Sequence, residues 1–266
     1  MKYQRKDEFV HARLILYSST AGFFIFPQGA GVMRIRQFFP GWKKPGILDP
    51  GSRDPVPFLS AAANSAGNCP EQSFRVSEDG MRFLAPPSSF RQITEVPEYC
   101  FADLASDDLV IDIGANVGAF CLRAARRSRQ VTTVEPVTAD ILRENIRLNK
   151  SPVTVIEGAL GDGSPQEICW DSRSVRVGTF PLHTLISLAG GCSFLKCDCE
   201  GAEWLIDPED LAGIRRIEME LHLPPISGPP DMALLDYLDR HYEYSIERKP
   251  VHDARGVLGI LHAERS

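Results

Sequence analysis

The chain has 266 residues, of which 43% are hydrophobic and 24% are charged, an ordinary balance for a soluble globular protein. That length is enough for one α/β domain with a full core and some additional chain. The formal net charge is −6, so we expect no nucleic acid among its partners.

Residues 1–72 are predicted to form an irregular, basic extension. Prolines and glycines recur between residues 40 and 57 and prevent long helices there. Residues 1–44 contain eight Lys or Arg and two acids, and the apolar stretch Leu14–Phe26 is too short and interrupted to span a membrane. Two interpretations of residues 1–44 remain open: a solvated extension, or a peripheral contact with a membrane surface or a protein.

Regular structure is predicted for residues 73–266. Ser73–Val76 and Met81–Leu84 flank Asp79-Gly80, a hairpin turn signal. From Leu109 onward, apolar strands alternate with helices, which predicts a mostly parallel sheet of the α/β class. The predicted strands are Leu109–Ile113, Val131–Glu135, Val153–Ile156, Ser193–Cys197 and Ile214–Leu221, followed by the antiparallel closing pair Tyr244–Glu247 and Val257–Leu261. The predicted helices are Val117–Arg127, Thr138–Asn149 and one that begins with Met232–Tyr237.

The segment Val110–Gly118 reads Val-Ile-Asp-Ile-Gly-Ala-Asn-Val-Gly. An apolar strand runs through Asp112 into a loop with two glycines and then into a helix. Glycines let the backbone turn sharply and approach a ligand closely, and a helix start offers free N–H groups. Ligands of open α/β sheets bind at the carboxyl ends of the strands, so this loop predicts a cofactor site.

Glu135 ends the second strand, 21 residues after Gly114. An acid there can bind both hydroxyls of a ribose, so the loop and the acid together predict a cofactor that contains adenosine. The dinucleotide pattern Gly-x-Gly-x-x-Gly is absent, because Asn116 stands in place of its second glycine, and Asp112 would repel a pyrophosphate. An acid at 112 suits the ammonium group of a methionine moiety, although it can also simply cap the turn. This pattern favours S-adenosylmethionine (SAM) over NAD.

A second group of polar residues leaves the fourth strand. Asp198, Glu200 and Glu203 follow it within six residues, which indicates substrate handling at the edge of the sheet. The alternative is the ordinary enrichment of acids at a helix N-terminus. His222 closes the fifth strand at the same edge. Its unperturbed pKa near 6.5 suits a general base at neutral pH, and Glu200 is the second candidate for that role.

The seven cysteines are odd in number. They argue against a disulfide framework and indicate a reducing, cytoplasmic compartment. Cys197 and Cys199 are separated by one residue, and no second pair lies at zinc spacing. We therefore expect no metal site.

These blocks, taken in order, resemble the signatures of FkbM-type methyltransferases over roughly residues 74–262. The matching segments are Asp112–Gly118, Glu135-Pro136, Asn145-x-x-x-Asn149, Lys196–Glu203 and Glu220-Leu-His222. The resemblance implies a class I Rossmann-like fold, SAM as methyl donor, and O-methylation of a hydroxyl on a small molecule, sugar or polyketide-like acceptor. It implies that the SAM pocket is lined by Asp112, Gly114, Ala115, Asn116, Gly118, Glu135 and Ala159. It further implies that Asp198, Glu200 and His222 face the transferred methyl group.

The chain departs from the family pattern in two places. Many class I enzymes carry an Asp after the third strand to hold adenine, where this chain reads Gly158-Ala159-Leu160. Adenine would then be held by backbone groups or by Asp162. The frequent Leu-Asp-Asp before the fourth strand appears here as Leu-His-Thr, starting at Leu182.

Three rival functions can be compared with these residues. An N-methyltransferase often carries an Asn/Asp-Pro-Pro-aromatic run after the fourth strand, and this chain does not. A non-catalytic SAM-binding regulator would have no need of the acids near residue 200. An NAD-dependent oxidoreductase is disfavoured by the composition of the glycine loop.

Overall fold

The computed structural model describes residues 17–19, 22–24, 74–84, 94–170, 173–224, 226–248 and 256–266. Most of the predicted extension, and with it the proposed contact surface of residues 1–44, lies outside these residues. Within that extension the structure describes the short antiparallel pair β1 (Tyr17–Ser19) and β2 (Gly22–Phe24). In the described part of the chain, every helix is too short or too polar to cross a bilayer.

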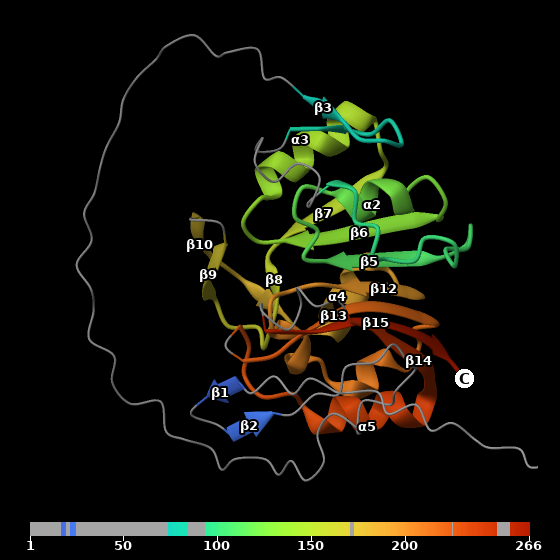
Figure 1. Ribbon diagram of the computed structural model, residues 1–266. Coiled ribbons are helices and arrows are strands. Elements are labelled where there is room, and N and C mark those ends of the chain that lie inside the picture. Colours follow the sequence, from blue (N-terminus) through green and yellow to red (C-terminus); the bar gives the residue numbers. More distant parts are fainter. Residues whose placement is uncertain are drawn as a thin grey trace, which may run out of the picture.

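The centre of the fold is a seven-stranded sheet with the strand order β14-β15-β13-β12-β5-β6-β7 (Figure 1). The strands are β5 (Leu109–Ile113), β6 (Gln130–Glu135), β7 (Val153–Glu157), β12 (Phe194–Cys197), β13 (Arg216–His222), β14 (Tyr242–Glu247) and β15 (Val257–Arg265). The five neighbouring strands β13, β12, β5, β6 and β7 are parallel to one another, whereas β15 is antiparallel to both of its neighbours. This order confirms the predicted Rossmann-like α/β class, including the antiparallel closing strand.

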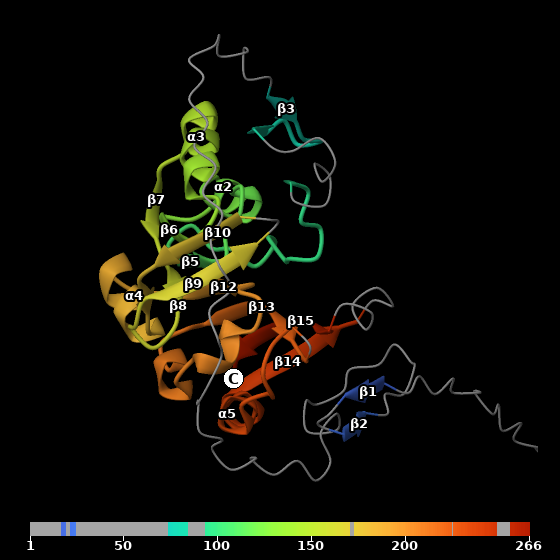
Figure 2. The ribbon, with the colours of Figure 1, turned by 90° about the vertical axis from the view of Figure 1, so that its left-hand side faces the viewer.

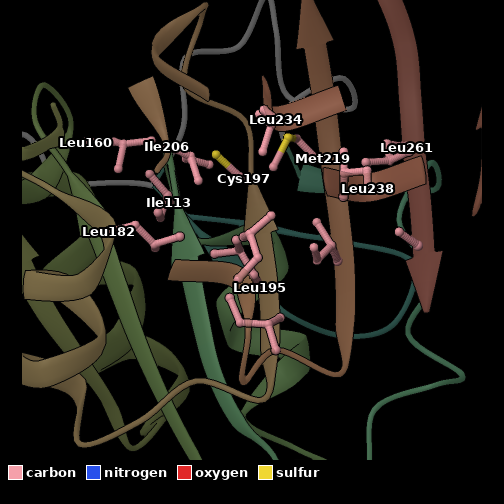
Figure 3. Packing of buried hydrophobic residues seen from close by; sticks show 14 of the residues in the cluster. Ile113, Leu160, Leu182, Leu195, Cys197, Ile206, Met219, Leu234, Leu238 and Leu261 are labelled. Carbon is pink, nitrogen blue, oxygen red and sulfur yellow. The ribbon is translucent and has the colours of Figure 1, made fainter. Parts of the chain in front are cut away.

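Two layers of helices cover the two faces of the sheet. The helices α2 (Ala119–Ala124) and α3 (Ala139–Asn149) pack on one face, and α4 (Leu182–Ala189) and α5 (Met232–His241) on the other. In β5 the side chain of Val110 joins the core of the α2 layer, and those of Ile111 and Ile113 join the core of the α4 layer. Figure 3 shows this second core, which includes Leu195 and Met219 of the central strands and Leu238 of α5.

The predicted hairpin around Asp79-Gly80 is present as β3 (Arg75–Val76) paired with β4 (Arg82–Phe83). Two asparagines of α3 hold its backbone: Asn145 Oδ1 accepts from the N–H of Leu84 at 2.7 Å, and Asn149 Oδ1 accepts from the N–H of Arg82 at 3.0 Å. The Asn-x-x-x-Asn motif therefore attaches the hairpin to the helix and does not reach the cavity described below.

The strands between residues 158 and 180 were not predicted from the sequence. They are β8 (Ala159–Leu160) beside β11 (Thr179–Phe180), and the antiparallel hairpin of β9 (Gln166–Trp170) and β10 (Arg173–Val177). Figure 2 faces this hairpin. Most described side chains of β9 and β10 are exposed and none is buried, so the alternation that identifies a strand in a sequence is weak in both strands. Helix α4 was missed as well, and α2 is shorter than predicted.

Candidate active site

A cavity of about 480 Å³ lies where β5, β6 and β12 end. Its wall also includes β8, the β9–β10 hairpin and the loop after β13. The volume falls in the range of small-molecule sites, and the position is the one at which open α/β sheets bind ligands. Six of the predicted site residues line it: Gly114, Asn116, Glu135, Ala159, Asp198 and Glu200.

Glu135 is fixed at the cavity wall by three backbone N–H groups. One carboxylate oxygen accepts from Asn116 at 2.7 Å, and the other accepts from Val137 at 2.7 Å and Thr138 at 2.9 Å. The residue is 5% exposed. A carboxylate has about four acceptor sites, and three are used by these N–H groups, so the oxygen that accepts from Asn116 can still receive one hydroxyl donor from the cavity.

Gly114 is required for a close approach between two loops. Its φ is +73°, and a Cβ atom on it would lie 1.7 Å from the backbone oxygen of Asp198. The glycine therefore brings the ends of β5 and β12 together and shapes the cavity floor. The sequence indicated a glycine for ligand approach, and the structure adds this backbone contact as a reason.

Asn116 occupies the left-handed region with a φ of +51°, where Asn is among the better tolerated residues. Its Oδ1 atom is buried and has no hydrogen-bond partner among the described residues. An unsatisfied buried acceptor costs about 1–3 kcal/mol. A donor group of a bound ligand would remove that cost.

Asp112 does not line the cavity, in contrast to its predicted contact with the cofactor. Its side chain is fully buried beside Lys196, whose Nζ lies 3.2 Å from Asp112 Oδ1. Burial raises the pKa of Asp112, and Lys196 partly offsets that rise. Burial alone would lower the pKa of Lys196, but Asp112 and Asp198 raise it above its usual range. Lys196 also donates a hydrogen bond to the carbonyl of Gly114 at 2.8 Å. The ion pair of Asp112 and Lys196 therefore stabilises the glycine loop from its buried side.

Ala115 and Gly118 also lie outside the cavity wall. Gly118 has a φ of +96°, and a Cβ atom there would lie 2.7 Å from Leu142 Cδ1 of α3. Ala115 is buried in the core of the α2 layer. Both residues pack the glycine loop onto the helices, which differs from the direct SAM contact that the resemblance implied.

His222 lies behind the cavity wall and is 1% exposed. Its Nδ1 is 3.1 Å from Glu203 Oε1, and the same oxygen accepts from its backbone N–H at 2.6 Å. Burial by itself would lower the pKa of His222, but Glu203 and Glu220 raise it to about 11. The imidazole thus does not have the ordinary pKa on which its predicted role as base was argued.

Glu203 is fully buried and does not line the cavity. Besides His222, it accepts from the N–H of Gly201 at 2.9 Å. Of the three acids predicted to handle substrate, Asp198 and Glu200 face the cavity, and Glu203 orients the histidine.

Asp198 is held by Tyr99, a residue that belongs to none of the predicted strands, helices or motifs. The hydroxyl of Tyr99 donates to Asp198 Oδ2 at 3.0 Å. Burial would raise the pKa of Asp198, yet Lys196 and His222 together lower it. No sequence motif marked Tyr99, because its partner is 99 residues away in the chain.

The β9–β10 hairpin contributes a wall that the sequence analysis also missed. Gln166–Cys169 of β9 line the cavity next to Ala159 and Leu160. Asp162, the alternative adenine ligand, is not in the wall and instead accepts from Ser164. A weak sequence signal did exist, since Ile168 and Trp170 alternate ahead of Val175 and Val177 across a two-residue gap.

No protein-family model and no curated protein sequence matches the chain, so the FkbM-type resemblance is not confirmed by these comparisons. Solved structures do match. An rRNA methylase from Streptococcus thermophilus is 11% identical over 61% of this chain and 89% of its own, with a TM-score of 0.41. A putative methyltransferase from Escherichia coli is 13% identical over 70% and 93%, with a TM-score of 0.42.

A third match is a magnesium protoporphyrin IX methyltransferase from Synechocystis with bound SAM. It is 16% identical over 62% of this chain and 73% of its own, with a TM-score of 0.38. At these identities and TM-scores the fold assignment rests on the strand order of the sheet itself.

One expectation about partners is wrong. We excluded nucleic acid because the net charge is −6, but the similar structures include an rRNA methylase. The net charge of a whole chain is a weak criterion, since contact with nucleic acid depends on how the charge is distributed over the surface. Nucleic acid is therefore not excluded as an acceptor.

Proposed function

We propose that this chain is a SAM-dependent methyltransferase that methylates a hydroxyl group of a small-molecule acceptor. The observation that carries the proposal is the charge of the cavity. Four acids line it, namely Glu135, Glu167, Asp198 and Glu200, and none of the described lining residues is Lys or Arg. Such a wall attracts a cationic cofactor and repels a pyrophosphate.

The fit to SAM is supported at two points of the wall. Glu135 presents a fixed carboxylate with one acceptor site still open, which suits a hydroxyl of a ribose. Asn116 presents a buried Oδ1 without a partner among the described residues, which suits the ammonium group of the methionine moiety. The two residues are joined by the hydrogen bond from the N–H of Asn116 to Glu135, so both contacts depend on one loop conformation.

The acceptor end of the cavity lies at Asp198 and Glu200 in this proposal. When bound, SAM would supply an electrophilic methyl group. The chain must then align the acceptor oxygen and take its proton, and alignment alone contributes several kcal/mol. The side chain of Glu200 is 54% exposed and its residue lines the cavity, so it is placed to take the proton. His222, the base predicted from the sequence, stands behind it with Nε2 at 3.4 Å from Glu200 Oε2.

Mass spectrometry with methyl-deuterated SAM tests this function. The full chain is incubated with a cell extract and with pure hydroxyl-bearing, amine-bearing and RNA acceptors. The proposal expects a deuterated methyl group on a hydroxyl-bearing small molecule. Glu200→Gln should reduce turnover by about 10²–10⁴-fold and change affinity for S-adenosylhomocysteine by no more than about threefold.

Other outcomes would contradict parts of the proposal. Label on an amine or on RNA would overturn the acceptor class. Saturable cofactor binding without any labelled product would favour the non-catalytic regulator. Unchanged turnover in Glu200→Gln would remove that residue as the proton acceptor.

A further inference from the structure

We propose that Asp198, Glu220 and His222 form a binding site for one divalent metal cation. Each residue offers one ligand atom, and the three atoms lie within 4.8 Å of one another. Asp198 follows β12, and the other two residues end the adjacent parallel strand β13. The site departs from our sequence expectation, which considered only thiol ligands.

The orientation of His222 supports a ligand role for its Nε2 atom. Glu203 is fully buried, lies outside the three-residue cluster and holds Nδ1 at 3.1 Å. With Nδ1 fixed, Nε2 points toward Glu220 at 3.5 Å and Glu200 at 3.4 Å. A carboxylate that holds the second ring nitrogen of a histidine is the usual support of a metal-ligating imidazole.

The local charge also favours the binding of a cation. Four carboxylates, those of Asp198, Glu200, Glu203 and Glu220, approach the single imidazole of His222. The nearby Lys196 lies closer to Asp112, at 3.2 Å, than to Asp198, at 3.9 Å. Carboxylates gathered in a largely buried place repel one another unless a proton or a cation intervenes. A divalent ion compensates two of these charges at once.

The donor set indicates which metals fit. One imidazole nitrogen with two carboxylate oxygens suits first-row transition ions such as Mn²⁺, Fe²⁺, Co²⁺ or Zn²⁺. Mg²⁺ and Ca²⁺ prefer oxygen ligands throughout. The side chains of Asp198 and Glu220 are 28% and 20% exposed, so an ion can reach the cluster from the cavity side.

The use of the ion rests on the proposed function, whereas its binding does not. Asp198 belongs both to this cluster and to the cavity wall. An acceptor hydroxyl whose oxygen is bound to a cation loses its proton more readily. The ion would then orient the acceptor next to Glu200 without any change of oxidation state.

Equilibrium dialysis of the full chain against Mn²⁺ tests the site. We expect one saturable Mn²⁺ per chain and weaker binding of Mg²⁺. Glu220→Gln removes a proposed ligand, and Glu203→Gln disturbs the support of His222; each should weaken Mn²⁺ by about 10–100-fold. Glu144→Gln, at a surface ion pair with Arg147, is the matched control and should not change binding. Thermal unfolding checks that each variant folds. If one of them does not, Asp198→Asn is measured in its place.

The absence of saturable Mn²⁺ binding would overturn the site, as would equal affinity in Glu220→Gln, Glu203→Gln and the control. Binding of S-adenosylhomocysteine is measured in parallel without metal. If that ligand binds and Mn²⁺ does not, the metal site fails and the proposed function stands. If Mn²⁺ binds and S-adenosylhomocysteine does not, the cofactor assignment fails.

Discussion

The side chain of Glu135 serves two needs at once. It joins the glycine loop to the start of α3 through three N–H groups, and it borders the cavity. A carboxylate already held by fixed donors needs little reorganisation to receive a ribose. Its position at the end of β6 therefore links local structure directly to cofactor affinity.

Replacing the carboxylate of Glu135 should weaken the binding of the cofactor. Glu135→Ala is expected to cost about 1.5–3 kcal/mol in binding of S-adenosylhomocysteine, the range for hydrogen bonds to a charged group. Glu157 is the matched control, because it is the register partner of Glu135 on β7 and lies outside the cavity wall. Calorimetry on Glu135→Ala and Glu157→Ala, with thermal unfolding of both, separates binding from stability. Equal affinity in the two variants would reduce Glu135 to a structural strand end.

Gly114 makes a different kind of contribution, through the space that its missing side chain leaves. Gly114→Ala places a Cβ atom against the backbone oxygen of Asp198 at a positive φ. We expect a loss of about 2–4 kcal/mol in the free energy of unfolding, from overpacking and backbone strain together. In contrast, Gly213→Ala meets nothing within 4 Å and should be close to neutral. Chemical denaturation measures both, and a neutral Gly114→Ala would show that the two loops can separate.

At the scale of elements, the β9–β10 hairpin completes a cavity that the central strands only begin. Ile168 of β9 lines the wall, and its cross-strand partner Val175 on β10 does not. The hairpin follows β8, which pairs with β11 outside the seven-stranded sheet, and it faces the ends of β6 and β12 across the cavity. It thus supplies the apolar side chain of Ile168 to the wall, together with Glu167, one of the four lining acids.

Ile168 and Val175, which lie opposite each other in this hairpin, give a matched pair of variants. Ile168→Ala should weaken S-adenosylhomocysteine by about 1–2 kcal/mol, since each buried carbon removed costs up to about 0.8 kcal/mol. Val175→Ala alters the same hairpin away from the cavity and should leave affinity unchanged. Calorimetry distinguishes the two cases. An equal loss in both variants would mean that the hairpin acts only through its stability.

The sequence predicted the central strands well because their burial pattern is local. Leu109–Ile113 matches β5 to the residue, and the strands around it differ only at their ends. The strands β9 and β10 carry only a weak alternation, in which Ile168, Val175 and Val177 are partly buried between exposed neighbours, and they were not predicted. The surroundings of His222 could not be predicted either, since Glu203 reaches it from 19 residues away and raises its pKa only after the sheet forms.

The predicted site residues also differ in how far a local sequence pattern determines where their side chains lie. Positions at strand ends, such as Glu135 and Asp198, line the cavity because parallel strands end at one edge. Asp112 lies within β5, and its side chain points into the α2 layer beside Lys196. The alternation of a strand determines that direction, and a motif match alone did not take it into account.

At the scale of the whole molecule, the sheet and the described cavity wall come from residues 109–265. We therefore propose that residues 1–72 modulate access to a substrate or a surface and do not build the cofactor site. A chain that begins at Ser73 should fold and bind S-adenosylhomocysteine within about threefold of the full chain, as calorimetry can measure. An insoluble product without binding would show that the extension completes the core. Co-sedimentation with anionic liposomes, compared between the two chains, tests the membrane contact.

The central claim is that the acid-lined cavity at the strand ends binds SAM and not a dinucleotide. Isothermal titration calorimetry of the full chain with S-adenosylhomocysteine and with NAD, under identical conditions, tests it most directly. The open acceptor site of Glu135 predicts saturable binding of S-adenosylhomocysteine through its ribose, and the four lining acids, with no Lys or Arg among the described lining residues, predict none of NAD. Binding of NAD with equal or higher affinity would contradict the claim.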